Sequence, residues 1–249
     1  MLNIMLCGCG GRMGAAVIAA AKEAGDRIVA GVDINPAADS PFPIFTAPDE
    51  FGGKADVIVD FSHHSALPGL LDYAVRTATP LVVCTTGHTE EETAAMRAAS
   101  ASVAVFFSRN MSLGINLLIS LCRRAAATLG ADFDIEIIEK HHNKKLDAPS
   151  GTALMIADAL SEDTAHAYVY DRHAERRARE KGEIGLHAVR GGTIVGEHEV
   201  MFCGKDEIVT LSHSAASREV FATGALRAAR FMKGRAPGFY NMDDVIGNL

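Results

Sequence analysis

The N-terminal segment LNIMLCGCGGRMGAAV constrains the fold of this 249-residue chain more than any other stretch. A short apolar run is followed by four glycines, Gly8, Gly10, Gly11 and Gly14. Glycines between a strand and a helix allow a tight turn, let a pyrophosphate approach the backbone, and leave the first N–H groups of the helix available. The standard G-x-G-x-x-G spacing would place its third glycine where Met13 stands. We therefore predict a variant dinucleotide-binding turn, with a turn that only packs well as the alternative.

Strand and helix patterns alternate through the first half of the chain. Runs rich in Val, Ile and Phe predict buried strands at 2–7, 27–33, 55–61, 80–86 and 102–108. Helical patterns lie between them at 14–25, 64–78 and 89–101. Apolar strands that alternate with helices indicate a parallel sheet covered on both faces. The expected fold class is α/β, with an N-terminal Rossmann-like dinucleotide-binding domain.

The pattern changes after residue 110. Helices are predicted at 114–130, 151–160 and 217–234, and strands at 133–142, 185–191, 196–204 and 206–214. The last three strands resemble an antiparallel meander, and the charged segment 171–183 predicts a mobile, solvated loop. We expect residues 113–216 to form an α+β domain with a mostly antiparallel sheet. Residues 1–112 with 217–249 would form the dinucleotide-binding domain, the last helix packing back on it.

Asp33 ends the second predicted strand, 19 residues after Gly14. A carboxylate at this place would bond the hydroxyls of the adenosine ribose and repel a 2′-phosphate. Since no Lys or Arg occurs from 28 to 53 to bind such a phosphate, we expect NADH to be preferred over NADPH. The alternative is an aspartate that merely ends a strand.

Two further loops follow predicted strands, CTTGH at 84–88 and SRNMSLG at 108–114. Ligands of open parallel sheets bind beyond the carboxyl ends of the strands. Thr85, Thr86 and Asn110 are therefore expected to meet the nicotinamide half of the nucleotide, unless these loops are only ordinarily polar.

The segment EKHHNKKLDAPSGTAL, 139–154, gathers positive charge on a chain of net charge −7. A metal site is disfavoured because adjacent histidines on a strand point to opposite faces and nearby lysines repel a cation. A solvated turn is a second interpretation. The third is an anion site with a proton donor, because His and Lys can both hold a carboxylate and release a proton. The PSGT sequence favours this third interpretation, since it starts a helix whose free N–H groups bind anions.

Composition restricts the remaining classes of function. The net charge of −7 argues against nucleic acid or an anionic membrane as the main partner. Five cysteines without a Cys-x-x-Cys pair argue against a disulfide framework and a structural zinc site. The N-terminus has no basic residue before its apolar run, and no apolar run reaches the length of a membrane span. We expect a cytoplasmic protein.

The chain resembles the 4-hydroxy-tetrahydrodipicolinate reductase (dihydrodipicolinate reductase) family over nearly its whole length. The motifs that carry this resemblance are GCGGRMG near the N-terminus, CTTG at 84–87, NMSLGIN at 110–116, EKHHNKKLDAPSGTA at 139–153, GEHEVMF at 196–202 and SHSAASREVFATGAL at 212–226. The segment from the histidines to the threonine is highly specific, whereas the glycine turn is not.

The resemblance implies an enzyme of the diaminopimelate route to lysine that reduces a cyclic dicarboxylate with NADH or NADPH. It assigns His141 as general acid or base, Lys145 as its partner proton donor, and His142, Gly151 and Thr152 as substrate-binding residues, with no metal. The nucleotide-binding residues would be Gly8, Cys9, Gly10, Gly11, Arg12, Met13, Asp33, Cys84, Thr85, Thr86, Ser108, Arg109, Asn110 and Met111. It also implies a homotetramer assembled through the sheet of the second domain.

Three residues depart from the family pattern. Cys84 stands where glycine is usual, Met111 where an aromatic residue is common, and Arg109 where a small residue is usual. The mechanistic hypothesis is hydride transfer to the ring, followed by protonation from His141 or Lys145. Another amino-acid oxidoreductase of the same fold, such as homoserine or aspartate dehydrogenase, would share the glycine turn without needing the His-His-x-x-Lys cluster. A dinucleotide-sensing regulator would normally add a DNA-binding helix pair or a basic face.

Overall fold

The computed structural model of the chain describes residues 1–35, 40–170, 172–174 and 176–247. The chain divides into two compact units, Met1–Leu113 with Arg218–Leu249, and Gly114–Ser217. The C-terminal segment therefore returns to the first unit, where α6 packs against α1. No helix of the described part of the chain is both long and apolar enough to cross a membrane.

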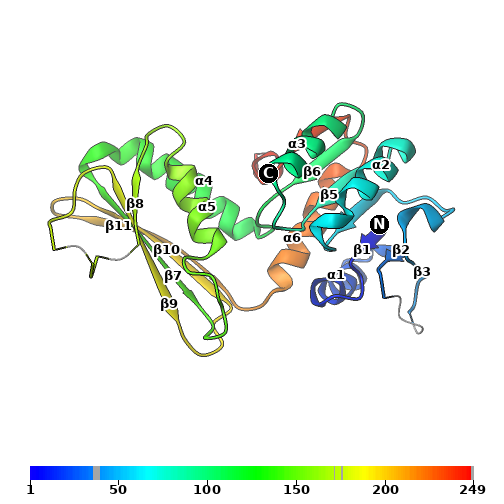
Figure 1. The fold of residues 1–249 in the computed structure, drawn as a ribbon, viewed down its shortest axis with the longest axis horizontal. Coiled ribbons are helices and arrows are strands. Elements are labelled where there is room, and N and C mark those ends of the chain that lie inside the picture. The colour runs from blue at the N-terminus through cyan, green and yellow to red at the C-terminus, as the bar shows by residue number, and fades with distance from the viewer. Residues whose placement is uncertain (36–39, 171, 175, 248–249) are drawn as a thin grey trace. The chain divides into compact units, whose positions relative to one another are not determined.

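The first unit alternates strands and helices as its sequence predicts (Figure 1). Its elements are β1 (Asn3–Cys7), α1 (Arg12–Glu23), β2 (Arg27–Val32), β3 (Ile44–Phe45), η1 (Pro48–Glu50), β4 (Val57–Asp60), η2 (His64–Ala66), α2 (Leu67–Thr77), β5 (Leu81–Val83), α3 (Glu90–Ala99), β6 (Ala104–Phe107), the first residue of α4, α6 (Glu219–Met232), β12 (Gly238–Tyr240) and α7 (Met242–Ile246).

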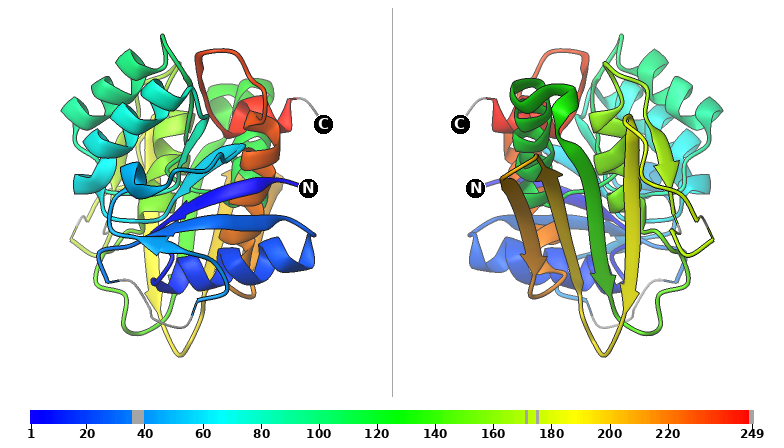
Figure 2. Two further views of the ribbon diagram at one scale, coloured as in Figure 1. Left: turned by 90° about the vertical axis from the view of Figure 1, so that its right-hand side faces the viewer. Right: turned by 90° about the vertical axis from the view of Figure 1, so that its left-hand side faces the viewer.

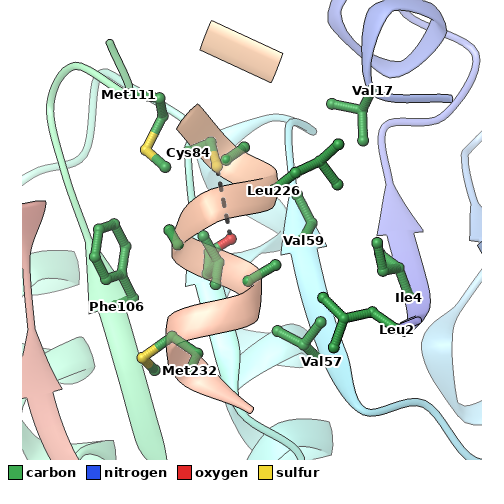
Figure 3. Close-up of a cluster of buried hydrophobic side chains, with 14 of the residues drawn as sticks. Leu2, Ile4, Val17, Val57, Val59, Cys84, Phe106, Met111, Leu226 and Met232 are labelled. Carbon is green, nitrogen blue, oxygen red and sulfur yellow. Dashed lines mark hydrogen bonds between the residues drawn. The ribbon is translucent and has the colours of Figure 1, made fainter. Parts of the chain in front are cut away.

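The seven strands form one parallel sheet in the order β12-β6-β5-β4-β1-β2-β3. One face packs against α1 and α6, and the other against α2 and α3. Figure 3 shows α6 lying over the first face, with Leu226 and Met232 among the side chains of the central strands. The parallel sheet with helices on both faces confirms the predicted α/β, Rossmann-like unit.

The second unit combines two helices with a five-stranded sheet. Its elements are α4 (Leu113–Leu129), η3 (Gly130–Asp132), β7 (Asp134–His141), α5 (Gly151–Leu160), β8 (Ala167–Val169), β9 (Glu183–Arg190), β10 (Gly196–Cys203) and β11 (Ile208–Ala215). Burial alternates along β7 and β10, so that one face of the sheet is buried under α4 and α5. In Figure 2 (right) the strands present the opposite face to the viewer.

The prediction of a mostly antiparallel sheet is wrong for half of the strand pairs. The strand order is β11-β10-β7-β9-β8, in which β10 pairs antiparallel with β11 and β7, whereas β9 pairs parallel with β7 and β8. The predicted meander is therefore interrupted, because β7 lies between β9 and β10. The reason is the helix α5, which forms a crossover between β7 and β9 and so lets the chain return in the same direction.

Ion pairs hold the charged segment 171–183 to the sheet, although most of its described residues are exposed. Arg172 and Arg179 both bond the carboxylate of Glu136 on β7, at 2.9 and 3.1 Å. Arg172 and Arg177 also bind Glu183 at the start of β9. Asp171 and Glu175 lie outside the described residues. Ion pairs, and not an apolar stripe, therefore hold this segment to the sheet.

Candidate functional site

The glycine turn of the first unit leaves no room for a side chain at two of its glycines, Gly8 and Gly14. Gly8 has a φ of +73°, and a β-carbon there would lie 2.4 Å from the carbonyl oxygen of Phe61. A β-carbon on Gly14 would lie 2.4 Å from the carbonyl oxygen of Gly8. Gly11 is the N-cap of α1 and makes no side-chain cap bond. The turn therefore brings bare backbone and an uncapped helix N-terminus together, which suits a pyrophosphate.

Asp33 lies at the carboxyl end of β2, beside this turn. Its Oδ2 accepts a hydrogen bond from the N–H of Gly10 at 2.9 Å, and its Oδ1 accepts one from the N–H of Asn35 at 3.0 Å. The carboxylate is thus fixed next to the glycine turn, where the adenosine ribose of a dinucleotide would lie in this fold.

A cavity of about 430 Å³ opens at the carboxyl ends of the strands of the first unit. Seven predicted residues line it: Met13, Cys84, Thr85, Thr86, Arg109, Asn110 and Met111. Five lining residues were missed by sequence reasoning: Phe61, Ser62, His63, His64 and Phe221. Phe61 ends the predicted strand 55–61, and Ser62, His63 and His64 directly follow it, so the strand-end rule applied to Thr85 would have found these four residues.

Asp60 organises the wall of this cavity. It is 1% exposed and accepts hydrogen bonds from the backbone and hydroxyl of Ser62, and from the hydroxyl of Thr85 at 2.8 Å. Burial raises the pKa of Asp60, although the bonds from Ser62 and Thr85 partly oppose the shift. Two loops that follow neighbouring strands are thereby tied to one carboxylate, which orders the polar wall before any ligand binds.

The remaining predicted nucleotide residues lie around the same sheet edge. Cys9 is buried and Arg12 is the exposed first residue of α1. Ser108 is buried, and its hydroxyl donates to the carbonyl of Asn110 at 2.7 Å. The glycine turn, the helix start and the fixed Asp33 fit a pyridine dinucleotide. Within the described residues no group of three or more His, Cys, Asp or Glu side chains is arranged to hold a metal ion.

His141 is the last residue of β7, and its side chain is 11% exposed. Its Nδ1 lies 2.6 Å from Oε2 of Glu139, which is fully buried. Burial alone would raise the pKa of Glu139, but the hydrogen bonds from Arg190 and His141 lower it below its ordinary value. A carboxylate that stays ionised can only accept a hydrogen bond, so the proton between the two groups belongs to Nδ1 of His141.

Lys145 lies in the loop that follows β7. Its backbone N–H bonds the carbonyl of His142, and its Nζ lies 2.9 Å from Oδ1 of Asp147. The pKa of Asp147 is lowered, chiefly by its bond from Lys145. His142 is half-buried, and no hydrogen-bond partner of its buried Nδ1 is found among the described residues. The loop therefore offers one charged donor and one imidazole nitrogen to a ligand.

Helix α5 begins at Gly151, as its sequence predicts, directly after this loop. Ser150 is the N-cap, and its hydroxyl accepts from the N–H of Ala153 at 3.2 Å. Gly151 is exposed and Thr152 is half-buried in a first turn without acidic residues. The first turn itself carries no acidic side chain, so its N–H groups suit a carboxylate. The second unit brings the predicted His141, His142, Lys145, Gly151 and Thr152 into one loop and its two flanking elements.

Sequence comparison connects both units to one family. The family models described as dihydrodipicolinate reductase, N-terminus, and dihydrodipicolinate reductase, C-terminus, match residues 2–111 and 114–246. The chain belongs to the dihydrodipicolinate reductase family. Curated reductases of this family include one from Caldanaerobacter subterraneus subsp. tengcongensis, which is 51% identical over 99% of this chain and 98% of its own length. The 4-hydroxy-tetrahydrodipicolinate reductase of Clostridium tetani is 45% identical over 100% of this chain and 98% of its own length.

The fold of a solved family member agrees with this result. The dipicolinate-bound dihydrodipicolinate reductase from Paenisporosarcina sp. TG-14 superposes with a TM-score of 0.79 at 24% identity, covering 97% of each chain. This likeness supports the α/β fold with its second, mixed sheet.

Two of the residues that depart from the expected dihydrodipicolinate reductase pattern belong to the core of the first unit. Cys84 and Met111 are 6% and 3% exposed, and both pack in the cluster under α6 (Figure 3). The thiol of Cys84 points to the carbonyl of Val82 at 3.9 Å, and burial raises its pKa well above the ordinary value. Cys84 is thus an inert core thiol that also lines the cavity, and its side chain carries no charge toward a nucleotide.

Proposed function

We propose that this chain reduces 4-hydroxy-tetrahydrodipicolinate to tetrahydrodipicolinate in the diaminopimelate route to lysine, in the cytoplasm. Family membership supports the reaction. The main structural support for this site is the position of the His141 imidazole. It bonds the buried carboxylate of Glu139 on β7, beside the loop that leads to the start of α5. Five free cysteines, four of them buried, are consistent with a reducing compartment.

The residues of the second unit would hold the dicarboxylate and supply the proton. The N–H groups at Gly151 and Thr152 would bind one carboxylate, and His142 and Lys145 would bind the substrate from the loop. Reduced nicotinamide, when bound, supplies hydride to ring carbon C4. After water has left the hydroxylated ring, His141 or Lys145 would protonate the reduced ring, a contribution of roughly 10²- to 10⁴-fold. The surrounding cations would stabilise negative charge as it develops on the ring.

We propose NADH as the better cofactor, with NADPH also used. The fixed carboxylate of Asp33 supports this preference, because it offers an acceptor to ribose hydroxyls and repels a 2′-phosphate. The cavity lined by Thr85, Thr86 and Asn110 would receive the nicotinamide half.

We further propose that the second units assemble into the homotetramer that the family resemblance implies. The open face of the second sheet supports such an interface, since it carries the exposed apolar side chains of Val189 and Ile208, 45% and 59% exposed. Lys140 and Glu197 form an ion pair of 3.1 Å on the same face. Light scattering of the purified protein should give about four times the chain mass of 26.4 kDa. A monomer mass would contradict this interface.

The reaction is tested by following the loss of NADH absorbance at 340 nm with enzymatically generated substrate. The proposal predicts substrate-dependent oxidation of NADH. Homoserine with NAD⁺, and aspartate with NAD⁺, serve as comparison substrates. If the protein oxidises homoserine or aspartate but does not reduce the dipicolinate ring, it is a different oxidoreductase of the same fold. Binding of NADH without turnover of any substrate would favour a nucleotide-sensing protein.

A further inference from the structure

Glu139 is the most heavily bonded carboxylate near the proposed proton donor. It is 0% exposed and accepts hydrogen bonds from four nitrogens of three residues. Arg190 donates through both terminal nitrogens, at 2.8 Å to Oε2 and 2.7 Å to Oε1, and His141 Nδ1 lies 2.6 Å from Oε2. The backbone N–H of Ser150, the N-cap of α5, donates to Oε1 at 3.0 Å. One buried carboxylate therefore connects the imidazole to the start of the carboxylate-binding helix.

Arg190 extends these connections to the lysine loop. The same Nη2 that bonds Glu139 also donates to the carbonyl of Asp147 at 2.6 Å. The side chain of Asp147 in turn holds Nζ of Lys145 at 2.9 Å. Nearby, the backbone N–H of Gly191 donates to the carbonyl of His141 at 2.9 Å. The end of β9 is thus bonded to both sides of the loop that carries the two proposed proton donors.

The bond between Glu139 and His141 decides which nitrogen faces a substrate. Nδ1 carries the proton shared with Glu139, so Nε2 is the nitrogen left to exchange a proton with a ligand. Two further charged or titratable groups lie beside this pair: Arg190 on β9, which bonds Glu139, and His198 on β10. The rings of His141 and His198 meet edge to face at 5.3 Å between centroids. Burial lowers the pKa of His198 to about 4, so this neighbour is neutral at the pH of the reaction.

We propose that Glu139 and Arg190 are positioning residues of the reaction: Glu139 orients His141 with Nε2 toward the substrate, and Arg190 holds Glu139 and the Asp147–Lys145 end of the loop in one arrangement. This inference rests on the proposed function, in which His141 gives or takes the proton. Neither residue is required to touch substrate, since each acts through another side chain. Comparable supporting carboxylates of histidines are worth about 10- to 100-fold in activity at metal sites.

The test compares Glu139→Gln with Glu136→Gln as a matched control. Glu136 lies on the same strand, faces the opposite side of the sheet, and also binds arginines and a histidine, with His187 Nε2 at 2.7 Å. Glu139→Gln keeps the size of the side chain but removes its charge. We expect its kcat to fall at least about tenfold with little change in NADH affinity, and Glu136→Gln to retain wild-type kcat.

Two readouts separate positioning from general support of the fold. In ¹⁵N NMR, His141 of the free wild type should show a proton on Nδ1 and a bare Nε2, and Glu139→Gln should mix the two tautomers. The high-pH limb of kcat should move to lower pH in Glu139→Gln, because the variant removes the carboxylate that bonds Nδ1 of His141. Glu139→Asp, which restores the charge, should return the limb toward its wild-type position.

The outcomes distinguish this inference from the proposed function. An active wild type, with an unchanged His141 tautomer and pH profile in a folded Glu139→Gln protein, would overturn the positioning role alone. A wild type that does not reduce the substrate would overturn the proposed function, whatever tautomer NMR shows. If Glu139→Gln does not fold, Arg190→Lys decides. Arg190→Lys keeps the positive charge but loses the pair of hydrogen bonds from Nη1 and Nη2 to Glu139. A fall in kcat together with a shifted high-pH limb would support the positioning role. A wild-type kcat and pH profile would overturn it.

Discussion

Gly196, the first residue of β10, lies against the imidazole of His141, the last residue of β7. A β-carbon at Gly196 would be 3.1 Å from Nε2 and 3.5 Å from Cδ2 of the ring. The antiparallel register of the two strands, with Glu197 opposite Lys140, brings these positions together. Because Glu139 holds the ring on its Nδ1 side, the imidazole has little freedom to move away.

Gly196→Ala is therefore expected to lower kcat by about tenfold to a hundredfold, since a small misplacement of a reacting group has effects of this size. The affinity for NADH should not change. The matched control is Gly191→Ala, also near His141, where a β-carbon would meet nothing within 4 Å. Steady-state kinetics of the two variants check this, and equal kcat values for both would contradict the account of the His141 environment.

Gly14→Ala should destabilise the first unit and weaken NADH binding. The added β-carbon would lie 2.4 Å and 2.5 Å from the carbonyl oxygens of Gly8 and Cys9, so the turn itself must shift. The control is Gly69→Ala in α2, where a β-carbon meets nothing within 4 Å. That change should stabilise the protein by up to about 1 kcal/mol through helix propensity. Thermal unfolding and NADH titration of both variants test the prediction, and a Gly14→Ala protein that binds NADH normally would refute it.

Asp33→Asn should raise the use of NADPH relative to NADH by about tenfold, because it removes the charge that repels a 2′-phosphate while retaining an acceptor for Gly10. The ratio of kcat/KM for the two nucleotides measures the effect. Glu50→Gln removes the same charge from η1 and serves as the control. A wild type with a markedly lower KM for NADPH than for NADH would show that Asp33 does not set the preference.

His198 should make stability depend on pH. Its pKa is lowered, chiefly by burial, to about 4, against 6.5 for an ordinary histidine. Between these values the unfolded chain binds more protons than the folded one, so stability is full above pH 6.5 and falls as the pH drops toward 4. The whole difference corresponds to about 3 kcal/mol.

Urea unfolding followed by circular dichroism from pH 7 to pH 4 measures this loss in wild type and in His198→Gln. The wild type should lose more stability over this range than the variant. Burial also lowers the pKa of His213. His213 is present in both proteins, so it contributes the same loss of stability at low pH to each. Parallel stability curves would mean that His198 is not buried in its neutral form.

Much of the first unit follows from its sequence because five of its strands, β1, β2, β4, β5 and β6, are short apolar runs. The helix start at Gly151 was also predictable, since Ser150 is a favourable N-cap after a proline turn. The strands β3, β8 and β12 were not predicted, because two or three residues carry no measurable period. The parallel pairing of β9 was missed because alternation identifies a strand but not its direction.

The support of His141 could be predicted only in part. Glu139 and His141 are two residues apart on a predicted strand, so their side chains share a face, and this signal was available. Arg190 is 51 residues from Glu139 in sequence. It comes into contact only through the register that places Arg190 beside His141 across β7 and β9. Such contacts depend on the strand order of the sheet, which local patterns do not specify.

The central claim is that His141 and Lys145 transfer the proton in a nucleotide-dependent ring reduction. The most direct measurement is kcat for wild type, His141→Gln and Lys145→Ala with generated substrate, together with NADH dissociation constants for all three proteins. We predict that each substitution lowers kcat by about 10²- to 10⁴-fold and leaves NADH affinity nearly unchanged. Full activity in both variants would contradict the assignment.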